Sequence, residues 1–315
     1  MRLLLPRDTA AAVTVAHRTK RTGNTTSVTD QVRCANLRLM FNQYVSDSCQ
    51  VIEHSQKGDK VLVPSLNDRH RGAQLRHLQE VYTEEKNEVQ AALTGHHARR
   101  QALLAALRGQ GLRVLTRPVI SRKKLLVGHG EPSVYDTGMT LHHTLGVPYL
   151  PGSALKGLTR HWLTALAAGG EALDGFSAEA LTALVTQLFG AGGDDAHAAA
   201  GLAVFFDALP LAPPTLSLSG QTPHYGPYYA ETPDTPDPKR PPADWYKPVP
   251  FSYLVLKSGV KFDLHLAVRR HATWDDAQYA HAVDSLGQWV TRALDAWGIG
   301  GKTRRGFGKC RERTT

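Results

Sequence analysis

The chain has 315 residues, 42% hydrophobic and 21% charged, with 37 Lys and Arg residues against 28 Asp and Glu residues. This composition excludes a disordered chain, and no apolar run is long enough for a membrane-spanning helix. The formal net charge of +9 favours a polyanionic partner such as RNA or DNA, although a merely soluble basic protein would carry the same charge.

The first 110 residues are predicted to form a mostly helical extension. A basic, Thr-rich stretch covers residues 18–29, and apolar residues at helical spacing predict a helix over residues 31–44. A longer apolar stripe predicts helical structure over residues 68–109, where Gly109 and Gly111 end it.

From residue 111 onward, strands and helices alternate, which indicates a sheet covered by helices in an α+β core over residues 111–315. Helices are predicted over residues 153–168, 178–189 and 274–297. Strands are predicted over residues 112–120, 139–149, 202–209, 252–256 and 260–269, and residues 124–127 continue the first strand after a kink.

A Pro-rich segment interrupts this core as an insertion at about residues 219–250. Nine of the 18 prolines lie between residues 223 and 250, a density that forbids a regular helix or central strand. We expect a projecting loop. Three of its tyrosines form a cluster that could stack on nucleic-acid bases or anchor the loop to its own domain: Tyr225, Tyr228 and Tyr229.

The cysteines Cys34, Cys49 and Cys310 are odd in number and form no CxxC motif. A disulfide framework or structural zinc site is therefore not expected, and a reducing cytoplasm is the predicted location. The opening MRLLLPRD is too short an apolar run for a secretory signal. No cofactor and no membrane partner are expected.

The segment VPYLPGSALKGLTR, residues 147–160, is the first candidate anion site. Ser153 stands where a helix N-cap belongs, and Gly152 would let a phosphate approach the exposed amides of the first helical turn. Lys156 and Arg160 lie four residues apart and share one helix face. The alternative is an ordinary capped helix with two solvated cations.

The C-terminal run GIGGKTRRGFGKCRER, residues 298–313, is the second. Its glycines would let backbone amides approach phosphates, and Phe307 offers a stacking face. A P-loop is excluded because Ala296 occupies the position of that motif's first glycine and only twelve residues follow Thr303. The alternative is a floppy basic tail. The cations of the run are Lys302, Arg304, Arg305, Lys309, Arg311 and Arg313.

A third basic run, Arg122-Lys123-Lys124, follows the first predicted strand and is a candidate RNA-binding segment. It could equally be a solvated edge that blocks sheet aggregation. Among the 15 histidines no HExxH motif occurs, so a metal site is not expected. One histidine would suffice as a general base for RNA cleavage through the 2′-hydroxyl. The candidates are His129, His142 and His143.

These motifs together resemble the RAMP superfamily of CRISPR-associated RNA-binding proteins. The matching segments are VPYLPGSALKGLTR, the FFDA of residues 205–208 and the terminal GGKTRRGFG. Residues 130–157 and the PHYGPYYA of residues 223–230 resemble, more narrowly, the subunit-six family of the type III-B effector, the Cmr complex. The resemblance covers roughly residues 112–310.

The resemblance implies a ferredoxin-like, RNA-recognition-type fold and a non-catalytic subunit that holds the 3′ part of the guide RNA (crRNA). The implied partners are this crRNA, its duplex with target RNA, and neighbouring Cmr-type backbone subunits. Asp136 resembles a cleavage carboxylate of another backbone subunit, but no catalysis is assigned to it. Phosphate-loop roles are implied for Gly152, Ser153, Lys156, Gly157, Gly301, Lys302, Thr303, Gly306, Phe307 and Gly308.

Two alternatives remain open. The chain could be a stand-alone RAMP endoribonuclease that processes CRISPR repeat RNA with a histidine base. It could also be a structural subunit that contacts only protein.

Overall fold

The computed structural model describes residues 14–22, 25–33, 36–42, 48–53, 60–64, 68–131, 133, 135, 137–191, 199–229, 241 and 243–314. The chain forms two compact units. Unit 1 comprises residues 1–84, 132–137 and 216–255, and unit 2 comprises residues 85–131, 138–215 and 256–315.

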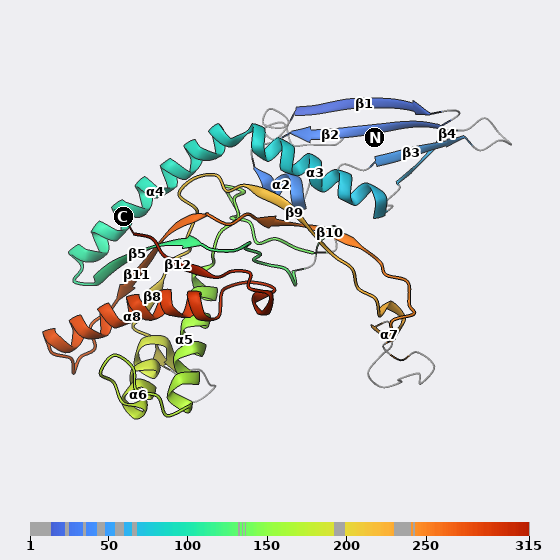
Figure 1. Ribbon diagram of the computed structural model, residues 1–315. Coiled ribbons are helices and arrows are strands. Elements are labelled where there is room, and N and C mark those ends of the chain that lie inside the picture. The colour runs from blue at the N-terminus through green and yellow to red at the C-terminus, as the bar shows by residue number, and fades with distance from the viewer. Residues whose placement is uncertain are drawn as a thin grey trace. The chain divides into compact units, whose positions relative to one another are not determined.

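Unit 2 is built on a four-stranded antiparallel sheet in the order β12-β5-β11-β8 (Figure 1). The strands are β5 (Arg113–Ser121), β8 (Ala203–Phe205), β11 (Lys261–Val268) and β12 (Cys310–Glu312). With helices α5 (Gly152–Ala168) and α8 (Asp276–Ala296), the chain order β5-α5-β8-β11-α8-β12 is the ferredoxin-like βαββαβ arrangement. The predicted α+β ferredoxin-like fold is confirmed.

Helices cover both faces of this sheet. Gly287 of α8 lies against Leu115 and Arg117 of β5, and α5 packs on α8 and on α6 (Ala178–Phe189). The long helix α4 (Lys86–Gly109) also contacts β5 and lies across the sheet from α8 (Figure 1). Its His97 Nε2 donates a hydrogen bond to the carbonyl of Pro210 at 3.0 Å.

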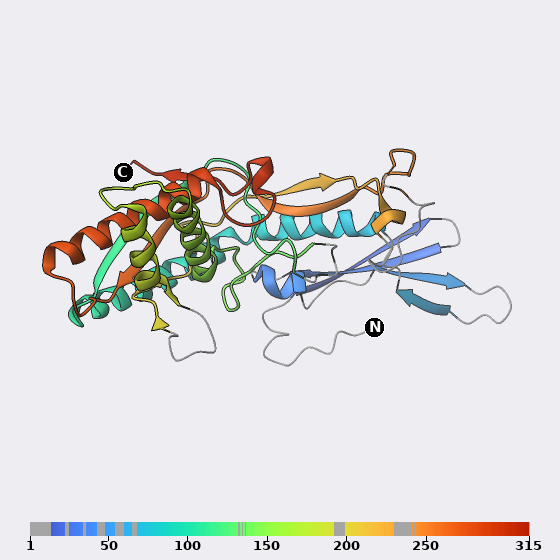
Figure 2. The ribbon, with the colours of Figure 1, turned by 90° about the horizontal axis from the view of Figure 1, so that it is seen from below.

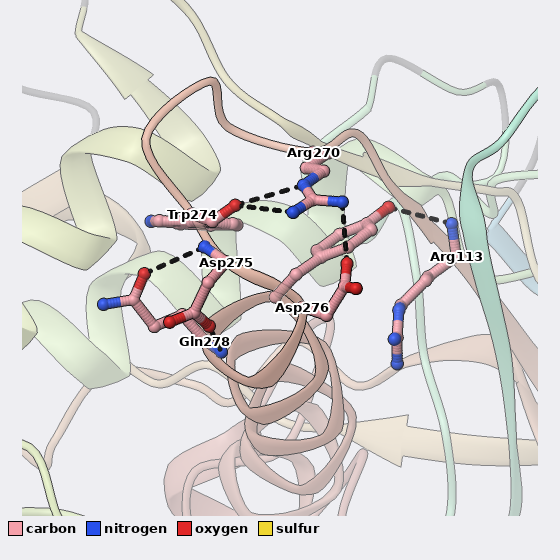
Figure 3. A network of polar contacts seen from close by, with 7 residues as sticks. Arg113, Arg270, Trp274, Asp275, Asp276 and Gln278 are labelled. Carbon is pink, nitrogen blue, oxygen red and sulfur yellow. Dashed lines mark hydrogen bonds and ion pairs between the residues drawn. The ribbon is translucent and has the colours of Figure 1, made fainter.

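The start of α8 is fixed by a polar network at the β11–α8 connection (Figure 3). Asp275 and Gln278 form a reciprocal capping box, which satisfies two backbone amides at the helix start. Arg270 donates to the carbonyl of Trp274 and pairs with Asp276 at 2.7 Å. The Tyr279 hydroxyl accepts from the Arg113 amide at 2.9 Å, which ties α8 to β5.

Unit 1 contains a sheet that the sequence did not predict within the first 110 residues. Four strands form an antiparallel sheet in chain order: β1 (Thr14–Thr22), β2 (Thr25–Arg33), β3 (Ser48–Glu53) and β4 (Lys60–Pro64). Among the described residues of 1–84, helix α2 (Leu37–Asn42) lies between β2 and β3, and helix α3 (Asp68–Glu84) follows β4. The helix predicted over residues 31–44 begins later, at Leu37, because residues 31–33 complete strand β2, which is rich in β-branched Thr and Val residues.

The Pro-rich insertion also belongs to unit 1. Strands β9 (Leu216–Gln221) and β10 (Phe251–Leu256) pair at its base, and α7 (Gly226–Tyr229) is a single turn. Residues 230–240 and 242 lie outside the described part of the chain, as does Asp136. Two short strands of unit 2, β6 (Gly190–Ala191) and β7 (Ala199–Ala200), pair with each other.

No helix in the described ranges is both long and apolar enough to cross a lipid bilayer.

Candidate nucleic-acid interface

Residues 298–309, which we name the C-terminal glycine loop, connect α8 to β12 in unit 2. Gly298, Gly300, Gly306 and Gly308 all have positive φ, between 73° and 87°. A Cβ on Gly300 would collide with the Leu126 carbonyl, and one on Gly308 would collide with the Ile299 carbonyl. Glycine is required at these two positions because protein backbone passes there without room for a side chain.

The backbone amides of the loop are largely used within the protein. Gly301 donates to the Leu126 carbonyl at 2.7 Å, and Gly308 donates to the Lys124 carbonyl at 2.8 Å. Gly306 and Phe307 donate to the carbonyls of Thr303 and Lys302. These amides therefore hold the loop in shape, and phosphate contact falls to the side chains and to the turn at its tip.

That tip is the 3-10 turn η1 (Thr303–Arg305), which exposes Arg304 and Arg305. Lys302 precedes it in the left-handed conformation, with φ 61°. A non-glycine residue in that conformation stores strain of about 1 kcal/mol or more, a feature that clusters at functional sites. The loop is thus a shaped, cation-bearing turn and not a floppy tail.

The run Arg122-Lys123-Lys124 lies directly beside this loop. The Arg122 amide donates to the Lys309 carbonyl at 2.8 Å, and the Lys124 carbonyl accepts from Gly308. The Arg122 side chain is half-exposed and pairs with Asp295 at 2.7 Å, while Lys123 is exposed. Two basic segments far apart in the sequence therefore meet at one edge of unit 2.

At the start of α5 the structure differs from the N-cap expected at Ser153. The helix begins at Gly152 after Pro151, and the Gly152 amide donates to Asp207 Oδ1 at 2.7 Å. Gly152 is buried and lies so close to the Phe205 carbonyl that a Cβ there would collide with it. A phosphate could reach the Gly152 amide only by displacing the Asp207 carboxylate.

The remaining candidates on α5 face outward. Ser153, Gly157 and Arg160 are exposed, and Lys156 is half-buried. His161, next to Arg160, packs edge-on against Trp297 with ring centroids 5.2 Å apart. Trp297 immediately precedes the C-terminal glycine loop, so this contact places the loop next to α5. The loop runs beside α5 in both views (Figures 1 and 2).

The aromatic candidates lie in the Pro-rich insertion of unit 1. The Tyr225 hydroxyl donates to Asp244 Oδ1 at 3.0 Å, while Tyr228 and Trp245 are exposed. Of Tyr229 only the backbone is described, within α7. A pocket of ≈ 450 Å³ opens here, lined by Gln221, Thr222, Pro223, His224, Tyr225 and Asp244.

The three candidate general bases have different surroundings. Gly301 lies against the His129 side chain, and burial together with the positive charge of Lys302 lowers the pKa of His129. Burial also lowers the pKa of His142, whereas His143 is exposed. Among the described residues no group of three or more His, Cys, Asp or Glu side chains is arranged to hold a metal ion.

Sequence reasoning missed three residues that shape the interface: Asp207, Asp295 and Trp297. Asp207 holds the first amide of α5, and Asp295 holds Arg122. The signal for Asp207 was present as the lone acid in FFDA, but its partner lies 55 residues earlier. Such long-range pairs cannot be read from spacing.

Comparisons with known proteins agree with this architecture. The family model described as the RAMP superfamily matches residues 122–311. The CRISPR system Cmr subunit Cmr6 of Pyrococcus furiosus is 30% identical over 244 residues, which cover 63% of this chain and 68% of that protein.

Among solved structures, the cryo-EM structure of the type III-B Cmr-beta bound to cognate target RNA has a chain of the same fold. It matches with a TM-score of 0.51 at 16% identity, covering 78% of this chain and 72% of that one. The crystal structure of Cmr6 from Pyrococcus furiosus matches with a TM-score of 0.40 at 28% identity, covering 64% of this chain and 99% of that one.

Proposed function

The chain belongs to the RAMP superfamily, and from that premise we propose that it is a non-catalytic, crRNA-binding subunit of a type III-B Cmr complex. The proposal extends the likeness to Cmr6 and to a chain of the Cmr-beta complex, whose structure contains target RNA. The observation that carries it is the C-terminal glycine loop, whose shape is set by contacts with protein backbone and whose Arg304 and Arg305 are exposed to solvent.

The proposed mechanism is electrostatic. Arg304 and Arg305 of the C-terminal glycine loop are exposed, and so is Lys123 in the segment hydrogen-bonded to that loop. Lys302 is held in place by a strained backbone. Each cation that neutralises a phosphate releases condensed counterions, which makes affinity depend on salt. Because these contacts touch the sugar–phosphate backbone, the protein should bind guides of different sequence similarly, and guide–target pairing should read the bases.

The first test is the salt dependence of RNA binding. For the double variant Lys302→Ala, Arg305→Ala, we expect the slope of log affinity against log salt to fall by about two units, one for each lost phosphate contact. The matched control is Lys257→Ala, an exposed lysine at the end of β10 and outside the loop. An unchanged slope in the double variant would favour a subunit that contacts only protein.

The ribonuclease alternative is separated by cleavage assays. We expect the purified protein alone, without metal, to leave repeat RNA intact, and the single variants His129→Ala, His142→Ala and His143→Ala to behave like the parent. Cutting that one of these substitutions abolishes would overturn the non-catalytic assignment.

We also propose that Cmr-type backbone subunits and the crRNA are the partners, and that Tyr225, Tyr228 and Tyr229 contact RNA or a neighbour. Mass spectrometry of the assembly that co-purifies with tagged protein, with sequencing of its bound RNA, tests the partners.

A further inference from the structure

A second polar cluster in unit 2 lies between α4 and the segments that follow β5 and β8. His96 and His97 of α4 have ring centroids 5.8 Å apart, and His142 lies 5.7 Å from His96. Tyr149 packs against His142 at 5.6 Å. Arg100, one helical turn after His96, places its guanidinium carbon 4.9 Å from the ring centre of Phe206.

The cluster holds hydrogen-bond donors without matching acceptors. Nη1 of Arg100 is buried and has no hydrogen-bond partner in the part of the chain that the structure describes. A buried donor without an acceptor keeps its full desolvation penalty, so the site favours a ligand that supplies one. Burial lowers the pKa of Arg100, and the nearby charge of Asp207, whose Oδ1 accepts the Gly152 amide, opposes this effect.

The histidine tautomers add a further donor. The amide of Leu145 donates to His142 Nδ1 at 3.4 Å, so Nδ1 acts as the acceptor and the ring proton of neutral His142 lies on Nε2. His97 donates through Nε2 to the Pro210 carbonyl, which fixes the orientation of its ring.

We infer that His96, His97, Arg100 and His142 form a binding site for a phosphoryl group, with the Arg100 guanidinium as its main anchor. A guanidinium matches the paired oxygens of phosphate, and it is already oriented here by the Phe206 ring. His142 Nε2 supplies a second donor, and His96 supplies charge when it is protonated. The site stands independently of the crRNA role proposed above.

Phosphate binding should be coupled to proton uptake. Burial and then the neighbouring charge of Arg100 lower the pKa of His96 to about 4, so this ring is neutral near pH 7 without a ligand. A bound anion favours the imidazolium and should raise that pKa. The titratable and charged groups acting on His96 and His142 are His97, Arg99, Arg100, His143 and Asp207.

Histidine NMR of the full chain titrated with inorganic phosphate tests the site. We expect saturable shifts of the His96 and His142 ring resonances, and a His96 pKa that rises with phosphate. Arg100→Gln should weaken binding by about tenfold or more, as for loss of a charged hydrogen bond. Arg99→Gln, which removes the same charge from an exposed neighbour on the same helix, should change affinity less than about twofold.

The proposal is overturned if the shifts grow linearly without saturation, or if Arg100→Gln and Arg99→Gln weaken binding equally. If Arg100→Gln fails to fold, the phosphate titration of the unmodified protein still tests the site. A His96 pKa that does not change with phosphate also overturns the proposal. Sulfate, which does not titrate in this range, serves for the pH arm, where binding should tighten as the pH falls toward about 4, the pKa of His96 without a ligand.

A short oligouridine added to phosphate-loaded protein identifies the source of the phosphoryl group. Displacement of phosphate assigns the site to RNA, and simultaneous binding assigns it to free phosphate. Lys302→Ala, Arg305→Ala should leave the phosphate shifts intact, so failure of this site and failure of the crRNA proposal can be distinguished.

Discussion

At the scale of single residues, Gly306 and Gly308 form a natural pair because both have positive φ but only one is crowded. A Cβ on Gly308 would collide with the Ile299 carbonyl, whereas a Cβ on Gly306 meets nothing within 4 Å. We expect Gly306→Ala to cost about 1 kcal/mol of unfolding free energy through backbone strain alone. Gly308→Ala should cost about 3 kcal/mol or more, because the backbone must also move.

Urea unfolding of both variants measures the difference. Equal losses of stability would show that the loop adapts to a side chain at residue 308, and that its shape is not set by contact with protein backbone. RNA affinity measured at a temperature where both variants are folded then reports on phosphate contact separately.

At the scale of elements, β11 is a central strand of the sheet and carries a histidine that the fold keeps neutral. His265 Nδ1 lies 3.0 Å from Thr116 Oγ1 of β5, and burial, followed by the charge of Arg100, lowers the pKa of His265 to about 4. The unfolded chain takes up this proton near the ordinary histidine pKa, about 6.5. Between these values the unfolded state binds more protons, so stability falls as the pH falls from about 6.5 to 4.

We therefore expect the melting temperature to drop over this pH range and the drop to shrink in His265→Gln. The control is His143→Gln, which replaces an exposed histidine of the same unit and should keep the parent's pH dependence. A parent-like drop in His265→Gln would mean that other groups cause the acid sensitivity.

At the scale of the whole molecule, the boundary predicted at residue 110 separates α4 from the sheet that it covers. The compact units divide the chain after Glu84 instead, and α4 buries Val89, Leu93 and Leu104. A chain lacking residues 1–110 should therefore melt at least about 5 °C below a chain lacking residues 1–84. Both shortened chains lose the same part of unit 1, so calorimetry of the pair isolates α4.

If the two shortened chains melt together, α4 contributes little to unit 2. The predicted boundary at residue 110 would then describe the stability of the molecule better than the compact units do.

The sequence alone determined the local features of this protein. Helical periodicity placed α5, α6 and α8 within two residues of their observed ends, and charge and glycine content marked the C-terminal glycine loop as a candidate site. The helix predictions succeed because periodicity depends on residues close in the chain.

Only the tertiary structure decided which partners those features meet. It paired Gly152 with Asp207, placed Arg122 beside Lys309, brought His96 next to His142, and showed a sheet before residue 65, where the sequence predicted a single helix over residues 31–44. The free energy of such contacts comes from residues tens to hundreds of positions apart, and a strand is stable only when another strand supplies its hydrogen bonds. That information is carried by the folded arrangement and not by local spacing.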